Sequence, residues 1–396
     1  MGGRSIPLGR IFGVKVGMDA TVLVIAALYT WMLATNRFPI EAPGHSTTAY
    51  WVAGTIAALL FFVSLLVHEV GHALVARDEG IGVQGISLWL LGGVARLESS
   101  PDNPAAELKI AVIGPIASAG CGAAFLAVAY GLPDSGLPGL AGHAAAWLGI
   151  LNLLLAGFNL LPAAPLDGGT VLSALVWMRT RSHAAGIRWA AYSGLATGIG
   201  LFAFGIMRLR GDDAGGFGIM VLLVGAFIAS SAWRSLRSIP IIQLLDGLVA
   251  ADAASPAPAF AHAGSTLPTF LHGLPLGTTQ QSFPVVGDDG TIRGVLTASA
   301  LRAASAGGNV NALRVTDLAY PLDRITIVRA GEPLLAALQK VDSGDVREGL
   351  VVADDGHVLG TLDGGTLQRT AQWRASQDAE RARANPPVGA TAGPYR

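Results

Sequence analysis

Five consecutive residues, His68-Glu69-Val70-Gly71-His72, carry the side chains that a catalytic zinc site requires. On a helix, two histidines four residues apart face the same side and could bind one zinc ion. A glutamate beside the first histidine could then act as general base toward a water molecule at that ion. The spacing predicts that His68 and His72 are metal ligands and that Glu69 is the base. The alternative is a cluster of core histidines with a structural role.

A third ligand must come from another part of the chain, because a catalytic zinc usually takes three protein groups. The only cysteine, Cys121, rules out a cysteine-based zinc knuckle. Asp167 is the candidate, because it follows Pro162 and Pro165 at a break in a long apolar stretch. Irregular backbone inside a membrane is tolerated only where it faces protein or a wet cavity. The alternative is that Asp167 caps a helix or turn.

The composition is that of a membrane protein, with 52% apolar residues and only 13% charged residues in 396. A formal charge of -1 argues against a nucleic-acid partner. The stretches that could cross a bilayer are Thr21–Ala34, Trp51–Ala76, Ala111–Tyr130, Ala144–Met178, Ala190–Met207 and Phe217–Trp233. The fourth stretch is too long for one span, and we expect it to break near Asp167. We therefore predict six spans.

The distribution of positive charge predicts that both ends of the membrane region are cytoplasmic. With the N-terminus inside, the cytoplasmic cations are Arg4, Arg10, Lys15, Arg77, Arg96, Lys109, Arg179, Arg181, Arg188, Arg234 and Arg237. Only Arg37, Arg208 and Arg210 then lie outside. Because no small-residue cleavage site soon follows Arg4, Arg10 and Lys15, we expect a signal anchor and no cleaved peptide.

The segment from Ile86 to Glu98 contains two short apolar runs that flank Gly92-Gly93. This pattern predicts a β-hairpin at the membrane surface, whose free edge could pair with an extended peptide. An ordinary structural loop is the alternative.

The combination of these motifs resembles the site-2 protease family, the zinc enzymes of regulated intramembrane proteolysis. The resemblance covers roughly Arg10 to Arg237. It rests on His68-Glu69-Val70-Gly71-His72, Gly92-Gly93, Gly114-Pro115 and Asn159-Leu160-Leu161-Pro162-Ala163-Ala164-Pro165-Leu166-Asp167-Gly168-Gly169. It implies that His68, His72 and Asp167 bind one zinc ion per chain, that Glu69 is the base, and that Asn159 lies near the site.

The function that the resemblance implies is metal-assisted hydrolysis of a peptide bond in a transmembrane protein. Asn159 could donate a hydrogen bond to the developing oxyanion or to the substrate backbone. It could equally bond carbonyl groups that the helix break leaves free. The substrate helix must unwind before it is cut. The resemblance also implies that another protease has already trimmed it.

The remainder of the chain contains an internal repeat with a period of about 66 residues. In each copy, an apolar strand, an Asp-Asp-Gly turn and a second strand follow one another, at 283–297 and 349–362. The copies resemble a tandem of CBS domains, which in many membrane proteins bind adenine nucleotides and regulate an attached unit. The family often has an Asp shortly after the Gly-x-x-Thr strand, where this chain has Ala300 and Thr366. Homodimerisation through the paired modules is the alternative to nucleotide binding.

The predicted architecture is an all-α polytopic membrane domain with a short membrane-associated β-hairpin, followed by an α/β tandem CBS module. The predicted boundaries are 1–238 for the membrane domain, 239–306 and 307–375 for the CBS pair, and 376–396 for a disordered tail. Two other functions fit parts of the pattern, namely a CBS-regulated ion transporter and an inactive protease-like scaffold. Glu69, which lies between the two histidines, favours an active protease over both of these. The expected location is the cell membrane, with a cytoplasmic CBS module.

Overall fold

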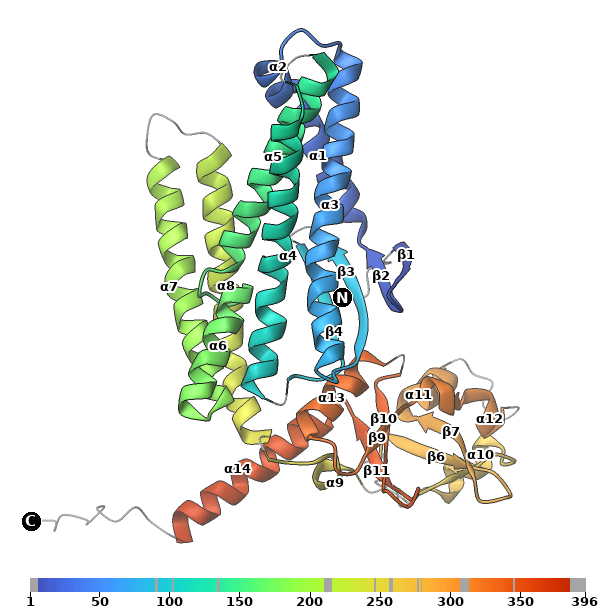
Figure 1. Cartoon of the computed structure of the whole chain (residues 1–396). Helices are drawn as coiled ribbons and strands as arrows, with labels where there is room; N and C mark the ends of the chain where they lie inside the picture. Colours follow the sequence, from blue (N-terminus) through green and yellow to red (C-terminus); the bar gives the residue numbers. More distant parts are fainter. Residues whose placement is uncertain are drawn as a thin grey trace, which may run out of the picture. The chain divides into compact units, whose positions relative to one another are not determined.

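The structure of the chain is a computed structural model (Figure 1). The structure describes residues 6–89, 92–101, 103–133, 136–209, 216–245, 247–255, 259–275, 278, 280–306, 313–344 and 346–384. The chain divides into two compact units, Met1–Ile239 and Pro240–Arg396.

The first unit is dominated by long apolar helices. Six helices in the described ranges are long and apolar enough to cross a membrane, which confirms the predicted number. They are α1 (Ala20–Met32), continued through η1 (Leu33–Arg37) and α2 (Phe38–Glu41), then α3 (Thr47–Asp78), α4 (Pro104–Gly131), α5 (Gly136–Asn159), α7 (His183–Leu209) and α8 (Gly216–Leu245). The protein is therefore a multi-pass membrane protein.

The long fourth stretch forms two helices, because the chain breaks after α5 and resumes at α6 (Asp167–Thr180). Gly168 and Gly169 allow the start of α6 to lie very close to the backbone of the loop that precedes it. A Cβ atom on Gly168 would lie 2.3 Å from the Leu161 carbonyl oxygen, and one on Gly169 would lie 2.4 Å from the Ala164 nitrogen. The glycine pair thus lets the start of α6 pack directly on the preceding loop, which fixes the position of Asp167.

A four-stranded sheet lies beside α3 in the order β1-β2-β3-β4. Its strands are β1 (Ile6–Ile11), β2 (Val14–Met18), β3 (Val83–Trp89) and β4 (Gly92–Leu97). The antiparallel pair β3–β4 is the predicted hairpin, whereas residues 90–91 between them lie outside the described ranges. Gly92 and Gly93 belong to β4 and do not form the centre of the turn.

Two strands precede the first span, so the segment before the expected anchor is folded. Residues 6–18 form a hairpin, and β2 pairs with β3 in parallel. Val14 and Val16 of β2 are buried against Leu65 and Ala73 of α3. The sheet therefore packs on the same helix that carries the histidine pair. Arg4 lies outside the described residues.

The second unit contains two α/β repeats, which confirms the predicted tandem architecture. The first repeat consists of β5 (Ala261–His262), α10 (Leu267–Gly273), β6 (Ser282–Val286), β7 (Ile292–Thr297) and α11 (Ala298–Ala306). The second consists of β9 (Thr326–Arg329), α13 (Leu334–Ser343), β10 (Glu348–Val352), β11 (Val358–Asp363) and α14 (Thr366–Ala384). The short helix α9 (Ala250–Ala253) precedes the first repeat, and α12 (Val315–Leu318), β8 (Tyr320–Pro321) and η3 (Leu322–Arg324) lie between the two.

The strand registers show how closely the two repeats correspond. Ser282 of β6 pairs with Thr297 of β7, and Glu348 of β10 pairs with Asp363 of β11. The turn glycines Gly290 and Gly356 both have positive φ, at 76° and 86°. The Asp-Asp-Gly turns were therefore placed correctly from the sequence.

The expected tail was partly wrong, because α14 continues to Ala384. Residues 376–384 are rich in Ala, Arg, Glu and Gln, which are strong helix formers and prolong the helix without an apolar face. Residues 385–396 lie outside the described ranges.

Candidate metal centre

The two histidines share one face of α3, as their spacing predicts. Their Nε2 atoms lie 3.2 Å apart and their ring centroids 4.8 Å apart. His68 and the adjacent Glu69 are both buried although they belong to an apolar helix. Two imidazole nitrogens at this separation can point toward one ion.

Asp167, in the first turn of α6, completes the cluster. Its Oδ2 atom lies 3.2 Å from Nε2 of His68, and its Oδ1 atom lies 3.5 Å from Nε2 of His72. One ligand atom from each of the three residues lies within 4.8 Å of the other two. The start of a helix also favours a negative side chain, because the backbone N–H groups there carry partial positive charge.

The outer nitrogen of each ring has a partner on α4, and these partners orient the rings. Nδ1 of His72 donates to the carbonyl oxygen of Ile110 at 2.6 Å, since a carbonyl can only accept. Nδ1 of His68 lies 2.9 Å from the hydroxyl of Ser118, which is fully buried. With the ring proton on Nδ1, each Nε2 presents a lone pair toward the centre of the cluster.

When both rings carry their proton on Nδ1, the inner nitrogens of the cluster have no proton to share. Asp167 Oδ2 is buried and has no hydrogen-bond partner among the described residues, despite its short distance to His68. Lone pairs on two nitrogens and a carboxylate oxygen converge on one point and repel one another. A bound cation would relieve this repulsion, so the donor set fits a zinc ion with three protein ligands.

Gly114 provides the space beside the histidine rings. A Cβ atom there would lie 2.2 Å from Nε2 of His72 and 2.6 Å from Nε2 of His68. Any larger residue would occupy the position in which the two nitrogens meet. The sequence indicated Gly114 only as part of the Gly114-Pro115 motif, whereas the structure shows why the position must be small.

Glu69 faces β4 and not the interior of the helix bundle. A Cβ atom on Gly93 would lie 2.3 Å from Cγ of Glu69, and the backbone N–H of Ala95 donates to the Glu69 carboxylate. The hairpin thus approaches the acid closely from one side. Gly93 is required because the backbone of β4 must pass beside this carboxylate.

Asn159 is the last residue of α5, and its side chain is partly buried. Among the contacts of the described residues, none joins its side chain to His68, His72 or Asp167. The structure therefore brings four of the five candidate residues together and leaves Asn159 outside their network. Ser118 and the carbonyl of Ile110 are the orienting groups that sequence reasoning missed. For Ser118, the only signal in the sequence was a small polar residue four positions after Gly114.

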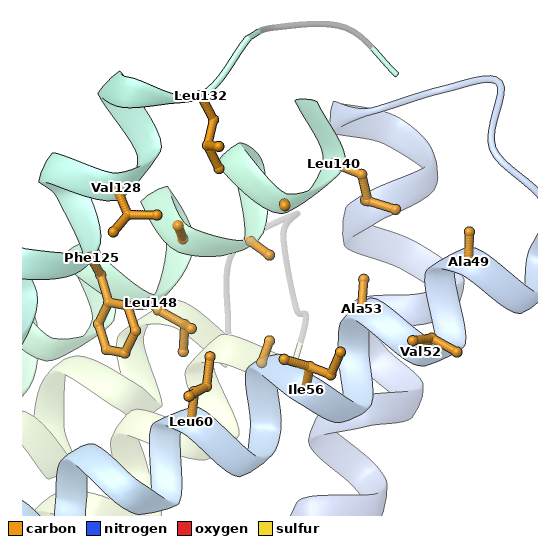
Figure 2. Close-up of a pocket in the computed structure, with 14 residues that line it drawn as sticks. Ala49, Val52, Ala53, Ile56, Leu60, Phe125, Val128, Leu132, Leu140 and Leu148 are labelled. Carbon is orange, nitrogen blue, oxygen red and sulfur yellow. The ribbon is translucent and has the colours of Figure 1, made fainter. Parts of the chain in front are cut away.

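An apolar cavity between the described helices is unsuited to this chemistry. It measures about 480 Å³ and is lined by apolar residues of α3, α4 and α5, of which Figure 2 shows Leu60, Phe125 and Leu148. His68 follows Leu60 by eight residues, or about 12 Å along the helix. No lining residue could bind a metal or carry a proton, so the candidate centre is the cluster around His68.

Comparison with known proteins gives consistent matches along the chain. The model of a family described as peptidase family M50 matches residues 56–139 and 137–201. A protein of Mycobacterium tuberculosis, provisionally named zinc metalloprotease Rip3, is 35% identical over 358 residues, which cover 90% of each chain. A Synechocystis protein, provisionally named zinc metalloprotease sll0528, is 31% identical over 94% of this chain and 97% of its own. The solved site-2 protease of Methanocaldococcus jannaschii is 26% identical and has a TM-score of 0.40. That match covers 58% of this chain and 94% of the other.

Proposed function

The chain belongs to peptidase family M50, the site-2 protease family of zinc metalloproteases, and we propose on that premise that it cuts transmembrane segments of other proteins. The observation that carries the proposal is the convergence of His68, His72 and Asp167 beside the buried acid Glu69. Regulated intramembrane proteolysis is the cellular process to which we assign this activity.

His68, His72 and Asp167 would hold one zinc ion per chain, and they form the only such group of three among the described residues. Bound there, zinc would supply Lewis-acid chemistry, which makes water a better nucleophile and polarises the substrate carbonyl. Ser118 and the Ile110 carbonyl keep both rings in the orientation that this binding needs.

Glu69 is the group that moves the proton. Its carboxylate would take a proton from the attacking water and return it to the amine nitrogen that leaves when the C–N bond breaks. The N–H of Ala95 holds the carboxylate on the side that faces the hairpin. We assign Asn159 a role in binding the oxyanion or the substrate backbone once the substrate is present.

The substrate peptide would add to the free edge of β4. This strand ends the described sheet, so its outer backbone groups can pair with an extended segment. The close approach of Gly93 to Glu69 puts such a segment next to the proposed base. A substrate helix with weak helix formers would unwind most readily to pair in this way.

We further propose that the N-terminus and the second unit are cytoplasmic, in a protein of the cell membrane. The excess of Lys and Arg in the segments assigned to that side supports this orientation. The CBS pair would regulate the protease. Its ligand would be an adenine nucleotide, or its paired modules would form a homodimer, and Ala300 and Thr366 weaken the case for the nucleotide.

The test is Glu69→Gln in the full-length chain, reconstituted in liposomes with a model transmembrane peptide. We expect zinc content near one per chain in both proteins, and new peptide termini only with the unchanged protein. Glu79→Gln is the matched control, because Glu79 pairs with Lys109 at the end of α3, away from the cluster. Continued cleavage by the Glu69 variant would overturn the proposal. Ion flux without new termini would favour a transporter, and zinc binding without cleavage would favour a scaffold.

A further inference from the structure

The hairpin β1–β2 leads directly into the first membrane span. Only Asp19 separates Met18 of β2 from Ala20 of α1. The Asp19 side chain accepts from the Thr21 N–H at 2.9 Å, and its own N–H donates to the Leu88 carbonyl at 2.8 Å. The end of the hairpin that holds Met18 is thus fixed to β3 and to the start of the span.

The strand directions place the other end of the hairpin toward the charged end of the apolar helices. Trp89, next to Leu88, contacts Phe227 of α8 with ring centroids 6.4 Å apart. Arg234 follows Phe227 by seven residues, about 10 Å along α8, and ends its apolar run. The four steps from Met18 back to Val14 span about 13 Å. β3 runs beside α3 (Figure 1) and β2 is parallel to β3, so the turn between β1 and β2 lies about one strand length farther toward the end at which the apolar run of α8 stops.

The hairpin exposes apolar side chains that the rest of the first unit does not cover. Ile6 is 39% exposed, Leu8 50% and Phe12 70%. β1 is also an edge of the sheet. Near a bilayer boundary, such side chains are covered by lipid.

Two exposed cations face each other on this hairpin. Arg10 of β1 pairs in register with Lys15 of β2, and like charges placed directly opposite destabilise a strand pair. Neither forms an ion pair with any residue in the described ranges. A third cation lies close by, because Nη1 of Arg77 donates to the Phe12 carbonyl at 2.6 Å. An anion between the two strands would remove the repulsion.

We propose that the hairpin β1–β2 binds the headgroup of an anionic phospholipid from the surrounding bilayer. Arg10 and Lys15 share its phosphate, Arg77 supports the turn, and Ile6 and Leu8 contact its acyl chains. The direct connection of the hairpin to α1 commits this surface to lipid and not to a second protein copy. The site is independent of the proteolytic activity.

Lipid binding can be measured on the full-length chain in nanodiscs of phosphatidylcholine, by titration with phosphatidylglycerol and native mass spectrometry. We expect Arg10→Gln combined with Lys15→Gln to weaken phosphatidylglycerol binding roughly ten- to thirtyfold. The matched control is Arg179→Gln with Arg181→Gln, which removes two cations from the end of α6. Because salt screens distant charges, this control should change the affinity for phosphatidylglycerol less than about twofold. Equal losses in both pairs, or no loss in the hairpin pair, would refute the site. Unfolding midpoints in phosphatidylcholine alone verify that the variants are folded. Arg10→Lys, which keeps the charge, should bind phosphatidylglycerol like the unchanged protein.

A single thiol label tests the contact itself. Cys121 is the only cysteine, so Cys121→Ala with Phe12→Cys gives one attachment point for a fluorophore at the turn. We expect brominated phospholipids to quench this label. A label that is shielded but unquenched, in a protein that dimerises, would show that a second copy covers the hairpin and that the proposal is wrong.

Discussion

The hydroxyl of Ser118 lies 2.9 Å from Nδ1 of His68, fully buried between α4 and α3. It is the only side chain among the described residues that bonds a ring nitrogen of the histidine pair from outside the cluster. For His72, the same task falls to the backbone carbonyl of Ile110. One of the two orienting bonds can therefore be removed by mutation, whereas the other cannot.

Ser118→Ala should weaken zinc binding, because His68 would lose the bond that fixes its tautomer and ring orientation. Loss of such a partner typically costs 10- to 100-fold in metal affinity, or about 1.4 to 2.7 kcal/mol. Competition with a chromogenic chelator measures this affinity without reference to activity. Ser64→Ala is the control, since Ser64 is a buried serine of α3 that bonds the Phe61 carbonyl instead. Equal affinity in the two variants would show that Ser118 has no orienting role.

Asp167→Asn tests the third ligand while keeping the side-chain shape. The amide lacks the negative charge and supplies a weaker donor, so two imidazoles alone would have to hold the ion. We expect the purified variant to retain little zinc after dialysis, as measured by elemental analysis, while its unfolding midpoint without metal stays the same or rises. The rise would follow from removal of the lone-pair repulsion at Oδ2. Full zinc retention would exclude Asp167 as a ligand.

Gly93→Ala should separate metal binding from catalysis. The new Cβ atom would lie 2.3 Å from Cγ of Glu69, so either the carboxylate or β4 must move. Such a shift should lower the rate of peptide cleavage by about tenfold or more, because small misplacements of a catalytic group are costly, while zinc content stays at the level of the unchanged protein. Gly157→Ala is the control, since a Cβ atom there meets no heavy atom within 4 Å. Unchanged cleavage by Gly93→Ala would show that the close approach of β4 does not position Glu69.

The parts of the site that were predictable from the sequence depend on local spacing. Two histidines four residues apart share a helix face wherever the helix lies, and the prolines before Asp167 break a span in any fold. Ser118 was not predictable, because its role depends on the packing of α4 against α3, and a serine among small residues has no distinctive pattern. The Ile110 carbonyl is invisible in principle, since every residue has one.

The fold shows the same division between local and long-range information. The six spans and the repeated Asp-Asp-Gly turns follow from composition and turn chemistry. The hairpin β1–β2 was missed because β2 pairs with β3, which is 70 residues away (Val16 with Ile86). Arg10 and Lys15 also resembled the positive flank of a membrane anchor. Long-range strand pairing leaves little trace in a single sequence.

The repeats meet through Glu348 and Ser282, which occupy equivalent positions 66 residues apart, and the Ser282 hydroxyl donates to the Glu348 carboxylate. The pKa of Glu348 is raised to about 7, chiefly by burial and also by Asp363 across the strand pair, while the Ser282 hydrogen bond and Arg369 oppose the rise. The folded state therefore holds a proton that the unfolded chain releases near its ordinary pKa of 4.5. The stability of the second unit should thus fall as the pH increases from about 4.5 to about 7.

Glu348→Gln should remove this dependence, because the amide stays neutral and can still accept from Ser282. At pH 8 the variant should be more stable by about 1 to 2 kcal/mol, after allowance for solvent screening at a partly exposed group. In the Cys121→Ala background, the thiol of Val351→Cys on β10 would be buried, so its labelling rate reports opening of this unit in the full chain. Corrected for thiol ionisation, that rate should be about five- to thirtyfold lower in the Glu348 variant at pH 8 and similar at pH 5. A pH profile unchanged by the substitution would mean that Glu348 is charged in the folded protein throughout this range.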